Sequence, residues 1–293
     1  MPHSFSNIRM RDVGAPSSAS AGLMQGKRGL VMGVANDHSI AWGIAKTLFE
    51  HGAELAFTYQ GEALGKRVKP LAHQLGSSLV LPCDVEDIAS VDATFDRLGK
   101  TWGNLDFVVH CIAYADRAEL KGRYADTTRE NFLRTMVISA FSFTEIAKRA
   151  APLMDRGGTM LTLTFGGATR AMPNYNVMGV AKAALEASVR YLAADFGPQN
   201  IRVNAISAGF IRTLAGAGGV ADGRPMFNFQ KAHAPLRRTI TLDDIGGSAL
   251  YLLSGLSSGV TGEIHYVDCG YNLIYIPRPE ELKDNGRPEK ATD

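Results

Sequence analysis

The sequence predicts a doubly wound α/β fold with a parallel sheet of seven strands. The first observation behind this prediction is that short apolar runs alternate with longer helical stretches from residue 28 onward, which is typical of parallel β/α crossovers. The second is that several of the runs are apolar on both faces, as strands buried between two helix layers are.

The expected strands are the apolar runs at residues 29–34, 53–59, 77–85, 105–113, 158–165, 201–207 and 262–268. The expected helices lie between them, at residues 39–51, 61–75, 87–99, 128–151, 175–196 and 242–254. No internal repeat or proline-rich linker divides this body. We therefore expect a single Rossmann-type domain over residues 22–276, after a disordered leader (1–21) and before a C-terminal tail (277–293).

One segment, residues 214–238, interrupts the alternation. It is Gly-rich at its start and then carries Met226, Phe227 and Phe229. A long insertion late in a compact domain is commonly a lid or binding loop, so we expect this segment to bind substrate. A surface loop without a binding role is the alternative.

Composition excludes several classes of function. The formal net charge of +2 over 293 residues is too small to indicate a partner such as nucleic acid or an anionic membrane. No run of about eighteen apolar residues occurs, so we expect no membrane span, and the first residues lack the apolar core of a secretory signal. The cysteines Cys83, Cys111 and Cys269 are odd in number and form no C-x-x-C pair, which favours reduced thiols in a cytoplasmic protein.

The first expected strand runs into "GVANDHSIAWGIAK", residues 33–46. Gly33 at the strand end would let the backbone approach a pyrophosphate, and Ser39 could cap the next helix, whose free N–H groups favour phosphates. Gly43 would let that helix pack close to the sheet or to a ligand. The spacing is not G-x-G-x-x-G, so nucleotide binding needs support from the rest of the chain.

The ends of the second and third strands indicate the adenosine side of a nucleotide. Gln60 stands where an Asp or Glu would bind the ribose of NAD, and no Lys or Arg adjoins it to balance a 2′-phosphate, which favours NADH over NADPH. Lys66 and Arg67 are expected on a solvated helix face. Asp84 and Val85, in "CDV", would lie at the adenine edge; the alternative is that Asp84 caps the next helix.

The fourth strand ends in "HCIAYA", where Cys111 and Ala113 are small enough to leave room for a nucleotide. His110 has no second His or carboxylate at ligand spacing, so we expect no metal site there.

Tyr175 and Lys182 lie seven residues apart on a helix that Pro173 or Asn174 opens and Gly197–Pro198 ends. Seven helical steps would bring the lysine to within about 20° of the tyrosine's direction and about 10 Å along the axis, against about 6 Å for a gap of four. Coupling between the two groups is then weaker. The tyrosine is freer to reach a substrate oxygen while the lysine holds the cofactor; a chance pairing is the alternative. The core stripe of this helix comprises Ala181, Leu185, Val189 and Leu192.

Taken together, "GVANDHSIAWGIAK", "GAELAFTYQ", "CDV", "PNYNVMGVAKAALEASVRYLA", "IRVNAISAGFIRTLA" and "GEIHYVDCG" resemble the NADH-dependent enoyl-[acyl-carrier-protein] reductases of bacterial fatty-acid synthesis. That family is a divergent branch of the short-chain dehydrogenase/reductases in which Tyr-x6-Lys replaces Tyr-x3-Lys. The resemblance spans roughly residues 22–271 and leaves out the leader and the tail.

The resemblance implies reduction of the trans-2 double bond of an enoyl thioester by NADH. Tyr175 would stabilise the oxygen of the forming enolate, and Lys182 would bind the nicotinamide ribose. Further implied cofactor-binding residues are Gly33, Ser39, Ile40, Gln60, Asp84, Val85, Ile112, Ile211 and Thr213. The implied substrate-binding residues are Ala113, Tyr114, Phe165, Tyr175 and Met226.

The family also implies a homotetramer and acyl-carrier protein as the partner that delivers the enoyl chain. Lys231, Arg237 and Arg238 could face that acidic carrier, although a solvated charged face would look the same. Two residues depart from the family pattern. Phe165 replaces a second tyrosine found in many members, so Tyr175 would act alone or with the cofactor ribose, and Ala113 replaces a glycine at a ligand wall.

Two other functions stay open at this stage. A 3-oxoacyl-carrier-protein reductase or another short-chain dehydrogenase would need a lysine four residues after its tyrosine, and no tyrosine here has one. Thr162 stands near where such enzymes keep a hydroxyl. A non-catalytic dinucleotide-binding regulator is the rival of another class; Tyr175 and Lys182 argue against it, whereas Phe165 leaves it open.

Overall fold

Seven parallel strands form one sheet in the order β3-β2-β1-β4-β5-β6-β7 in the computed structural model, which describes residues 22–211 and 223–276. The strands are β1 (Arg28–Met32), β2 (Glu54–Tyr59), β3 (Val80–Pro82), β4 (Phe107–His110), β5 (Gly158–Phe165), β6 (Ile201–Ala208) and β7 (Ile264–Val267). Every neighbouring pair is parallel. The predicted seven-stranded doubly wound fold is confirmed.

The helices are α1 (Ile40–Glu50), α2 (Gly61–Gln74), α3 (Ile88–Trp102), α4 (Arg129–Met136), α5 (Ser142–Ala150), α6 (Asn176–Phe196), α8 (Gly223–His233) and α9 (Leu242–Leu253). Side chains at their N-termini explain several of the starts. Asp87 accepts from an amide in the first turn of α3, Thr128 does so for α4, and Thr241 with Asp244 forms a capping box on α9.

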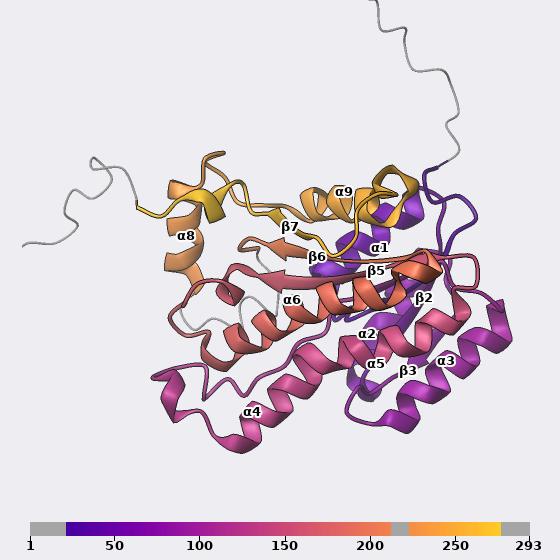
Figure 1. Cartoon of the computed structure of the whole chain (residues 1–293), viewed down its shortest axis with the longest axis horizontal. Helices are drawn as coiled ribbons and strands as arrows, with labels where there is room; N and C mark the ends of the chain where they lie inside the picture. The colour runs from indigo at the N-terminus through magenta and orange to yellow at the C-terminus, as the bar shows by residue number, and fades with distance from the viewer. Residues whose placement is uncertain (1–21, 212–222, 277–293) are drawn as a thin grey trace, which may run out of the picture.

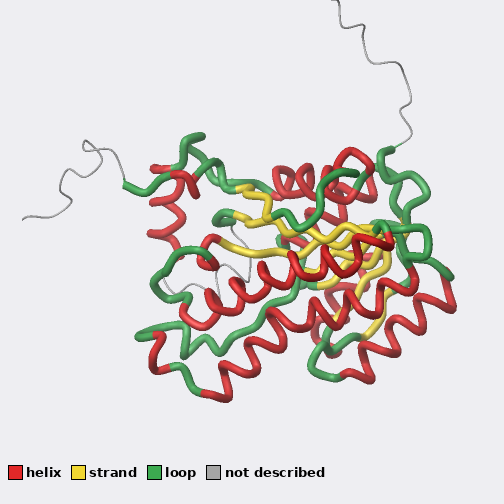
Figure 2. The backbone as a smooth tube through the Cα atoms, viewed as in Figure 1, coloured by secondary structure: helices red, strands yellow, loops and turns green. Residues whose placement is uncertain are grey.

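The sheet is buried between two helix layers (Figures 1 and 2). Successive residues of β1 point to opposite faces, so Val31 packs in the core formed with α1, α2 and α9, whereas Leu30 and Met32 pack in the core formed with α3, α5 and α6. This arrangement explains why the central strands are apolar on both faces. Among the described residues, no helix combines the length and the apolar character needed to cross a membrane.

The carboxyl ends of the strands define the ligand-binding edge. The strand order reverses between β1 and β4: β2 and β3 extend the sheet on one side of β1, and β4 to β7 extend it on the other. In open α/β sheets, ligands bind in the crevice at such a switch point. Helix α8 lies beyond the arrowheads of β5 and β6 in Figure 1, at the same edge of the sheet.

The expected helix over residues 128–151 is interrupted. A π-helical turn, Val137–Phe141, separates α4 from α5. Within it, the Ser139 hydroxyl accepts from the Tyr114 N–H at 2.8 Å and donates to the Tyr114 carbonyl at 2.8 Å. The widened turn therefore attaches the helix to the loop that follows β4. Such turns occur frequently at functional sites.

The expectation that Gly43 packs against the sheet or a ligand is wrong. A Cβ atom at Gly43 would lie 2.8 Å from the Cβ atom of Leu242, the first residue of α9. The glycine therefore permits a close crossing of α1 and α9 in the helix layer.

Candidate functional site

Tyr175 occupies the N-cap position of α6, with φ −120° and ψ −28°. The helix thus begins at Asn176, later than the predicted start at Pro173 or Asn174. Asn174 and Asn176 have φ values of +60° and +36°, in a region that few residues other than glycine adopt and that asparagine tolerates best. This unusual backbone presents the tyrosine from the end of the helix, and such strain is concentrated at functional sites. The predicted core stripe of the helix is confirmed as buried: Ala181, Leu185, Val189 and Leu192.

The Tyr175 side chain is enclosed by aromatic rings and is only 9% exposed. Its ring meets Phe165 edge-on with 5.2 Å between centroids, and Phe165 meets Phe210 in the same way at 5.1 Å. A Cβ atom at Gly167 would lie 2.5 Å from Cδ1 of Tyr175, so only glycine leaves room for the ring. Burial, with a smaller effect from the charge of Glu186, raises the pKa of Tyr175. The phenol therefore stays a neutral hydrogen-bond donor.

Lys182 is buried below Tyr175 on α6 and is 6% exposed. Its Nζ donates to the carbonyl oxygen of Leu163 at 2.7 Å, which fixes the ammonium beside the end of β5. Burial lowers the pKa of Lys182 to about 8, and electrostatic interactions with Cys111 and Glu186 oppose that change. The lysine is thus a cation that titrates close to neutral pH.

Glu186 is a buried neighbour of Lys182 that the sequence analysis missed. Its Oε1 accepts from the Thr164 hydroxyl at 2.7 Å. Burial raises the pKa of Glu186, and the Thr164 hydrogen bond, Arg190 and Lys182 oppose that rise. The signal in the sequence is a carboxylate four residues after the lysine, on the buried side of the same helix.

A cavity of about 140 Å³ lies at the N-terminus of α1, between the ends of β1 and β4. Gly33 has φ +95°, and a Cβ atom there would lie 2.1 Å from the Cys111 carbonyl oxygen. Only glycine allows the two strand ends to approach so closely. The lining residues are Gly33, Ala35, Ser39, Ile40, Ala41, Cys111, Ile112, Ala113, Leu163 and Lys182.

Ser39 is the N-cap residue of α1, but its side chain makes no capping hydrogen bond, contrary to the prediction. Its hydroxyl oxygen instead accepts from the backbone N–H groups of Ala35 and Asn36, each at 3.0 Å. The hydroxyl also donates to the Asn36 side chain. Because the loop occupies this hydroxyl, Ser39 shapes the turn that leads from the sheet into the helix.

The ends of β2 and β3 are joined by Gln60 and Asp84. The Gln60 amide donates to Asp84 Oδ2 at 3.0 Å, and Asp84 Oδ1 accepts the backbone N–H of Glu86 at 3.0 Å. Asp87, and not Asp84, caps α3, so the alternative role for Asp84 is wrong. Val85 is buried beside them.

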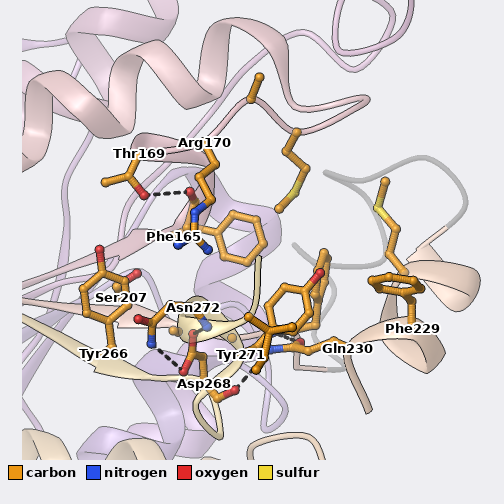
Figure 3. A pocket seen from close by; sticks show the side chains of 18 of the residues that line it. Phe165, Thr169, Arg170, Ser207, Phe229, Gln230, Tyr266, Asp268, Tyr271 and Asn272 are labelled. Atoms are coloured by element: carbon orange, nitrogen blue, oxygen red, sulfur yellow. Dashed lines mark hydrogen bonds between the residues drawn. The ribbon is translucent and has the colours of Figure 1, made fainter. Parts of the chain in front are cut away.

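A larger cavity of about 830 Å³ opens between the loop after β5, the ends of β6 and β7, and α8 (Figure 3). Its apolar wall includes Phe165, Phe210, Met226 and Phe229. Phe165 and Met226 also pack in one hydrophobic cluster with Tyr175. The structure thus brings three of the predicted substrate residues, Phe165, Tyr175 and Met226, together in one cluster.

Other predicted residues lie elsewhere. The Tyr114 ring lies under the guanidinium of Arg134, and Ile211 packs on the core at the end of β6. Thr213 and residues 214–222 of the predicted substrate loop lie outside the described residues. The next part of that segment forms helix α8, which the prediction of a loop did not include.

The remaining basic residues singled out in the sequence are exposed. Lys66, Arg67, Lys231 and Arg237 have exposed side chains. Arg238 makes two hydrogen bonds to Asp244 in the first turn of α9, at 2.6 and 3.0 Å, so part of its charge is balanced within the chain.

His110 is fully buried at the end of β4, with Thr162 3.1 Å from Nδ1 and Ser142 3.0 Å from Nε2. Ser142 donates its own proton to the Ile138 carbonyl, so its oxygen must accept from Nε2–H. This assigns the ring proton to Nε2, and the Thr162 hydroxyl lies 3.1 Å from Nδ1 and 3.2 Å from the His110 carbonyl oxygen, two acceptors for its one proton. Burial, with the nearby charge of Lys182, lowers the pKa of His110 to about 3.

The model of one protein family, described as Enoyl-(Acyl carrier protein) reductase, matches residues 33–272. The chain belongs to the enoyl-(acyl carrier protein) reductase family. The match includes the nucleotide cavity, Tyr175 and Lys182, and it confirms the resemblance inferred from the sequence.

Similar proteins agree with this family assignment. Enoyl-[acyl-carrier-protein] reductase [NADH] 2 of Rhizobium meliloti (strain 1021) is 72% identical over 262 residues, which cover 89% of this chain and 97% of that protein. The crystal structure of FabI from Candidatus Liberibacter asiaticus aligns with TM-score 0.86 and 59% identity over 88% of this chain and 100% of that one. The Anaplasma phagocytophilum reductase, crystallised with NAD, aligns with TM-score 0.85 and 56% identity over 89% and 100%.

The residues of this enoyl reductase fit a dinucleotide. Gly33 leaves open a space that any Cβ would fill, and the N-terminus of α1 favours phosphate at the same place. The buried cation of Lys182 lies at one end of the cavity, and the amide and carboxylate of Gln60 and Asp84 lie after the neighbouring strands.

Proposed function

We propose that this chain reduces the trans-2 double bond of enoyl-acyl-carrier-protein thioesters with NADH during fatty-acid elongation. The observation that carries the proposal is Tyr175, whose neutral side chain packs with the wall of the larger cavity while Lys182 lines the smaller one. The donor proposed for the substrate and the cation proposed for the cofactor thus belong to different parts of the site.

Dinucleotide binding is assigned to the strand ends. Gly33, Ser39 and Ile40 would receive the pyrophosphate, and Gln60, Asp84 and Val85 the adenosine. Ile112, Lys182, Ile211 and Thr213 would contact the nicotinamide half. When bound, the reduced nicotinamide supplies the hydride that reaches the β-carbon of the substrate.

Tyr175 would donate its hydrogen bond to the thioester carbonyl. Negative charge grows on that oxygen during hydride transfer, and a donor positioned there stabilises the charge as it forms. Because burial raises the pKa of Tyr175, the phenol keeps its proton and acts as a hydrogen-bond donor. Phe165 contributes no second hydroxyl, so its ring orients Tyr175 through the edge-on contact.

Lys182 would hold the ribose hydroxyls of the nicotinamide half through its ammonium. Its hydrogen bond to the Leu163 carbonyl fixes the direction of the remaining N–H donors. Glu186 supports the positive charge in a buried position. The lysine therefore positions the cofactor and does not act on the substrate oxygen.

The acyl chain would enter the larger cavity along Phe165, Phe210 and Met226. Ala113 lines the smaller cavity. Because Tyr114 faces Arg134, any contact of its ring with substrate would be secondary. The carrier protein that delivers the chain would meet the exposed basic side chains of Lys231 and Arg237.

A homotetramer in the cytoplasm is the assembly we propose. Exposed apolar side chains on α4, the π turn and α6 support it: Leu133 is 57%, Phe141 54% and Tyr191 75% exposed. Contiguous exposed apolar patches mark association sites, and we infer that these three side chains contribute to one. Sedimentation of the wild type against Tyr191→Glu tests this assembly, with a smaller species expected for the variant.

A ketoreductase activity is disfavoured by the position of Thr162. Its hydroxyl is fully buried and bonded to His110, so it does not face the substrate cavity. The decisive assay follows absorbance of NADH and, in parallel, NADPH with crotonyl and longer trans-2-enoyl thioesters, and with acetoacetyl thioester. Oxidation of NADH with the enoyl substrates alone is expected. Activity on acetoacetyl thioester alone would refute the proposal, and NADH binding without any turnover would favour a regulator.

A further inference from the structure

Glu86 and Arg134 form a paired contact at the adenosine end of the site. Arg134, on α4, donates from Nε and Nη2 to the two carboxylate oxygens of Glu86, at 2.9 and 2.8 Å. Glu86 follows Asp84 and Val85 on the loop after β3. The ion pair therefore joins a helix to the loop that carries the proposed adenine-binding residues.

Tyr114 completes this contact from the loop after β4. The Arg134 guanidinium carbon lies 4.5 Å from the centre of the Tyr114 ring, and Nη1 lies 3.4 Å from the phenol oxygen. The backbone of Tyr114 is itself held by Ser139 in the π turn, through two hydrogen bonds of 2.8 Å. Arg134 is thus fixed by its carboxylate partner and by an aromatic face at the same time.

The contact continues to the end of β2. Asp84 accepts from the Glu86 backbone with one oxygen and from Gln60 with the other. Three strand-end loops and α4 are consequently joined through Gln60, Asp84, Glu86, Arg134 and Tyr114. All three loops carry residues assigned to the dinucleotide: those after β2 and β3 to the adenosine, and the loop after β4, through Ile112, to the nicotinamide half.

Exposure decides what such a contact can do. The side chains of Arg134 and Glu86 are 48% and 32% exposed, so water and salt weaken the pair and it contributes little to global stability. Its two parallel bonds nevertheless restrict the relative movement of two loops. A restraint of this kind acts on opening of a site and hence on ligand dissociation.

We propose that Glu86, Arg134 and Tyr114 form a clamp across the adenosine end of the dinucleotide site and slow the dissociation of NADH. The residues of this clamp are positioning residues, because they act through the loops that hold Asp84, Val85, Ile112 and Ala113. This inference rests on the proposed function, which places the adenosine at the loops after β2 and β3 and the nicotinamide half at the loop after β4, so that the clamp joins the two parts of the dinucleotide site.

The test measures NADH dissociation by stopped-flow fluorescence in the full-length wild type, Glu86→Gln, Arg134→Gln and the swapped double variant Glu86→Arg/Arg134→Glu. Each single variant is expected to release NADH about threefold to tenfold faster and to raise KM for NADH in proportion. With crotonyl thioester and saturating NADH, kcat does not fall. The swapped variant is expected to release NADH slowly again. At high salt, the difference in NADH release rate between the single variants and the wild type is expected to become smaller.

Glu54→Gln is the matched control. Glu54 accepts from Arg28 at 2.8 Å, and Arg28 lies over the Trp102 ring, but this pair stands at the amino ends of β1 and β2, away from the site. Wild-type release rates in Glu86→Gln and Arg134→Gln overturn the clamp. Equal acceleration in Glu54→Gln overturns it too, because the effect would then be one of general stability. Failure of the wild type to bind NADH refutes the proposed function itself, and the clamp with it.

Discussion

The residues at the catalytic end of the site are buried, whereas those at the adenosine end are exposed to solvent. Tyr175 and Lys182 are 9% and 6% exposed, and their neighbours are aromatic rings, glycines and the backbone of β5. Glu86 and Arg134 are a third to a half exposed and are bonded to other polar side chains. Burial shifts pKa values and makes each single contact count, whereas exposed contacts are individually weak and act only as a connected set.

The largest effect is expected from Tyr175→Phe, which removes only the hydroxyl. Turnover of crotonyl thioester should fall by at least about tenfold, because the growing charge on the carbonyl oxygen loses its donor. NADH affinity, measured by fluorescence titration, should change little. Tyr124→Phe, at an exposed position outside both cavities, is the control. Unchanged turnover in Tyr175→Phe would show that Tyr175 is not the hydrogen-bond donor to the substrate carbonyl.

Gly167→Ala tests whether close packing sets the position of Tyr175. The added methyl would lie 2.5 Å from the tyrosine ring, so the ring must move, and we expect kcat to fall by about tenfold. Gly166→Ala is the control, since a Cβ atom there has no neighbour within 4 Å. Steady-state kinetics of both variants at saturating NADH decide the matter. Equal kcat values in Gly167→Ala and Gly166→Ala would mean that the Tyr175 ring can move without loss of activity.

Lys182→Ala should weaken NADH binding before it affects chemistry. The variant loses the only buried ammonium seen among the described residues that line the smaller cavity, and we expect the dissociation constant of NADH to rise by about tenfold. Lys46→Ala, on the exposed side of α1, provides the comparison. Equal NADH affinity in the wild type and Lys182→Ala would contradict the assigned role.

The pH dependence of NADH use distinguishes the two residues of the catalytic end. The pKa of Lys182 is lowered to about 8, so its ammonium is present below that pH and is lost above it. The kcat/KM for NADH should therefore fall as the pH rises through about 8. The pKa of Tyr175 is raised, so the phenol adds no change in this range. Lys182→Arg should keep its charge and remove the alkaline decrease.

The smallest effect is expected at the solvent-exposed adenosine end, from Asp84→Asn. Asn can still accept from the Glu86 N–H, and Gln60 can rotate its amide to keep their hydrogen bond, so KM for NADH should rise by only about threefold. Steady-state kinetics with varied NADH would measure it. A tenfold or larger loss would mean that the carboxylate charge itself holds the nucleotide.

The fold was predictable because its signals are local and repeated. Apolar runs and helical periodicity predicted the places of all seven strands and most helices, although the runs at 77–85 and 105–113 hold only the shorter strands Val80–Pro82 and Phe107–His110. The interruption at Val137–Phe141 could not be foreseen, since no proline or glycine marks it and the contact that accompanies it joins Ser139 to Tyr114 from a distant segment. Tertiary contacts of this kind leave no trace in periodicity.

The site was predictable where a single residue type is enough to indicate a role. Gly33 at a strand end and the Tyr175–Lys182 pair indicated where a nucleotide and a donor belong. Gly167 and Arg134 escaped notice, because their importance depends on the ring of Tyr175 and the carboxylate of Glu86, which only the fold brings near. The expected cap by Ser39 was wrong for the same reason, because its hydroxyl hydrogen-bonds to the preceding loop and not to the first turn of α1.

His110 offers an internal probe of how the sheet responds to turnover. With a pKa lowered to about 3, its imidazole stays neutral at every pH at which the enzyme would be assayed, so its NMR signals report surroundings and not titration. The Nε2 proton is shared with Ser142 directly after the π turn. If that turn shifts when nucleotide binds, the His110 Nε2 proton should change its chemical shift and its rate of exchange with solvent. Protons elsewhere in the buried core should change less.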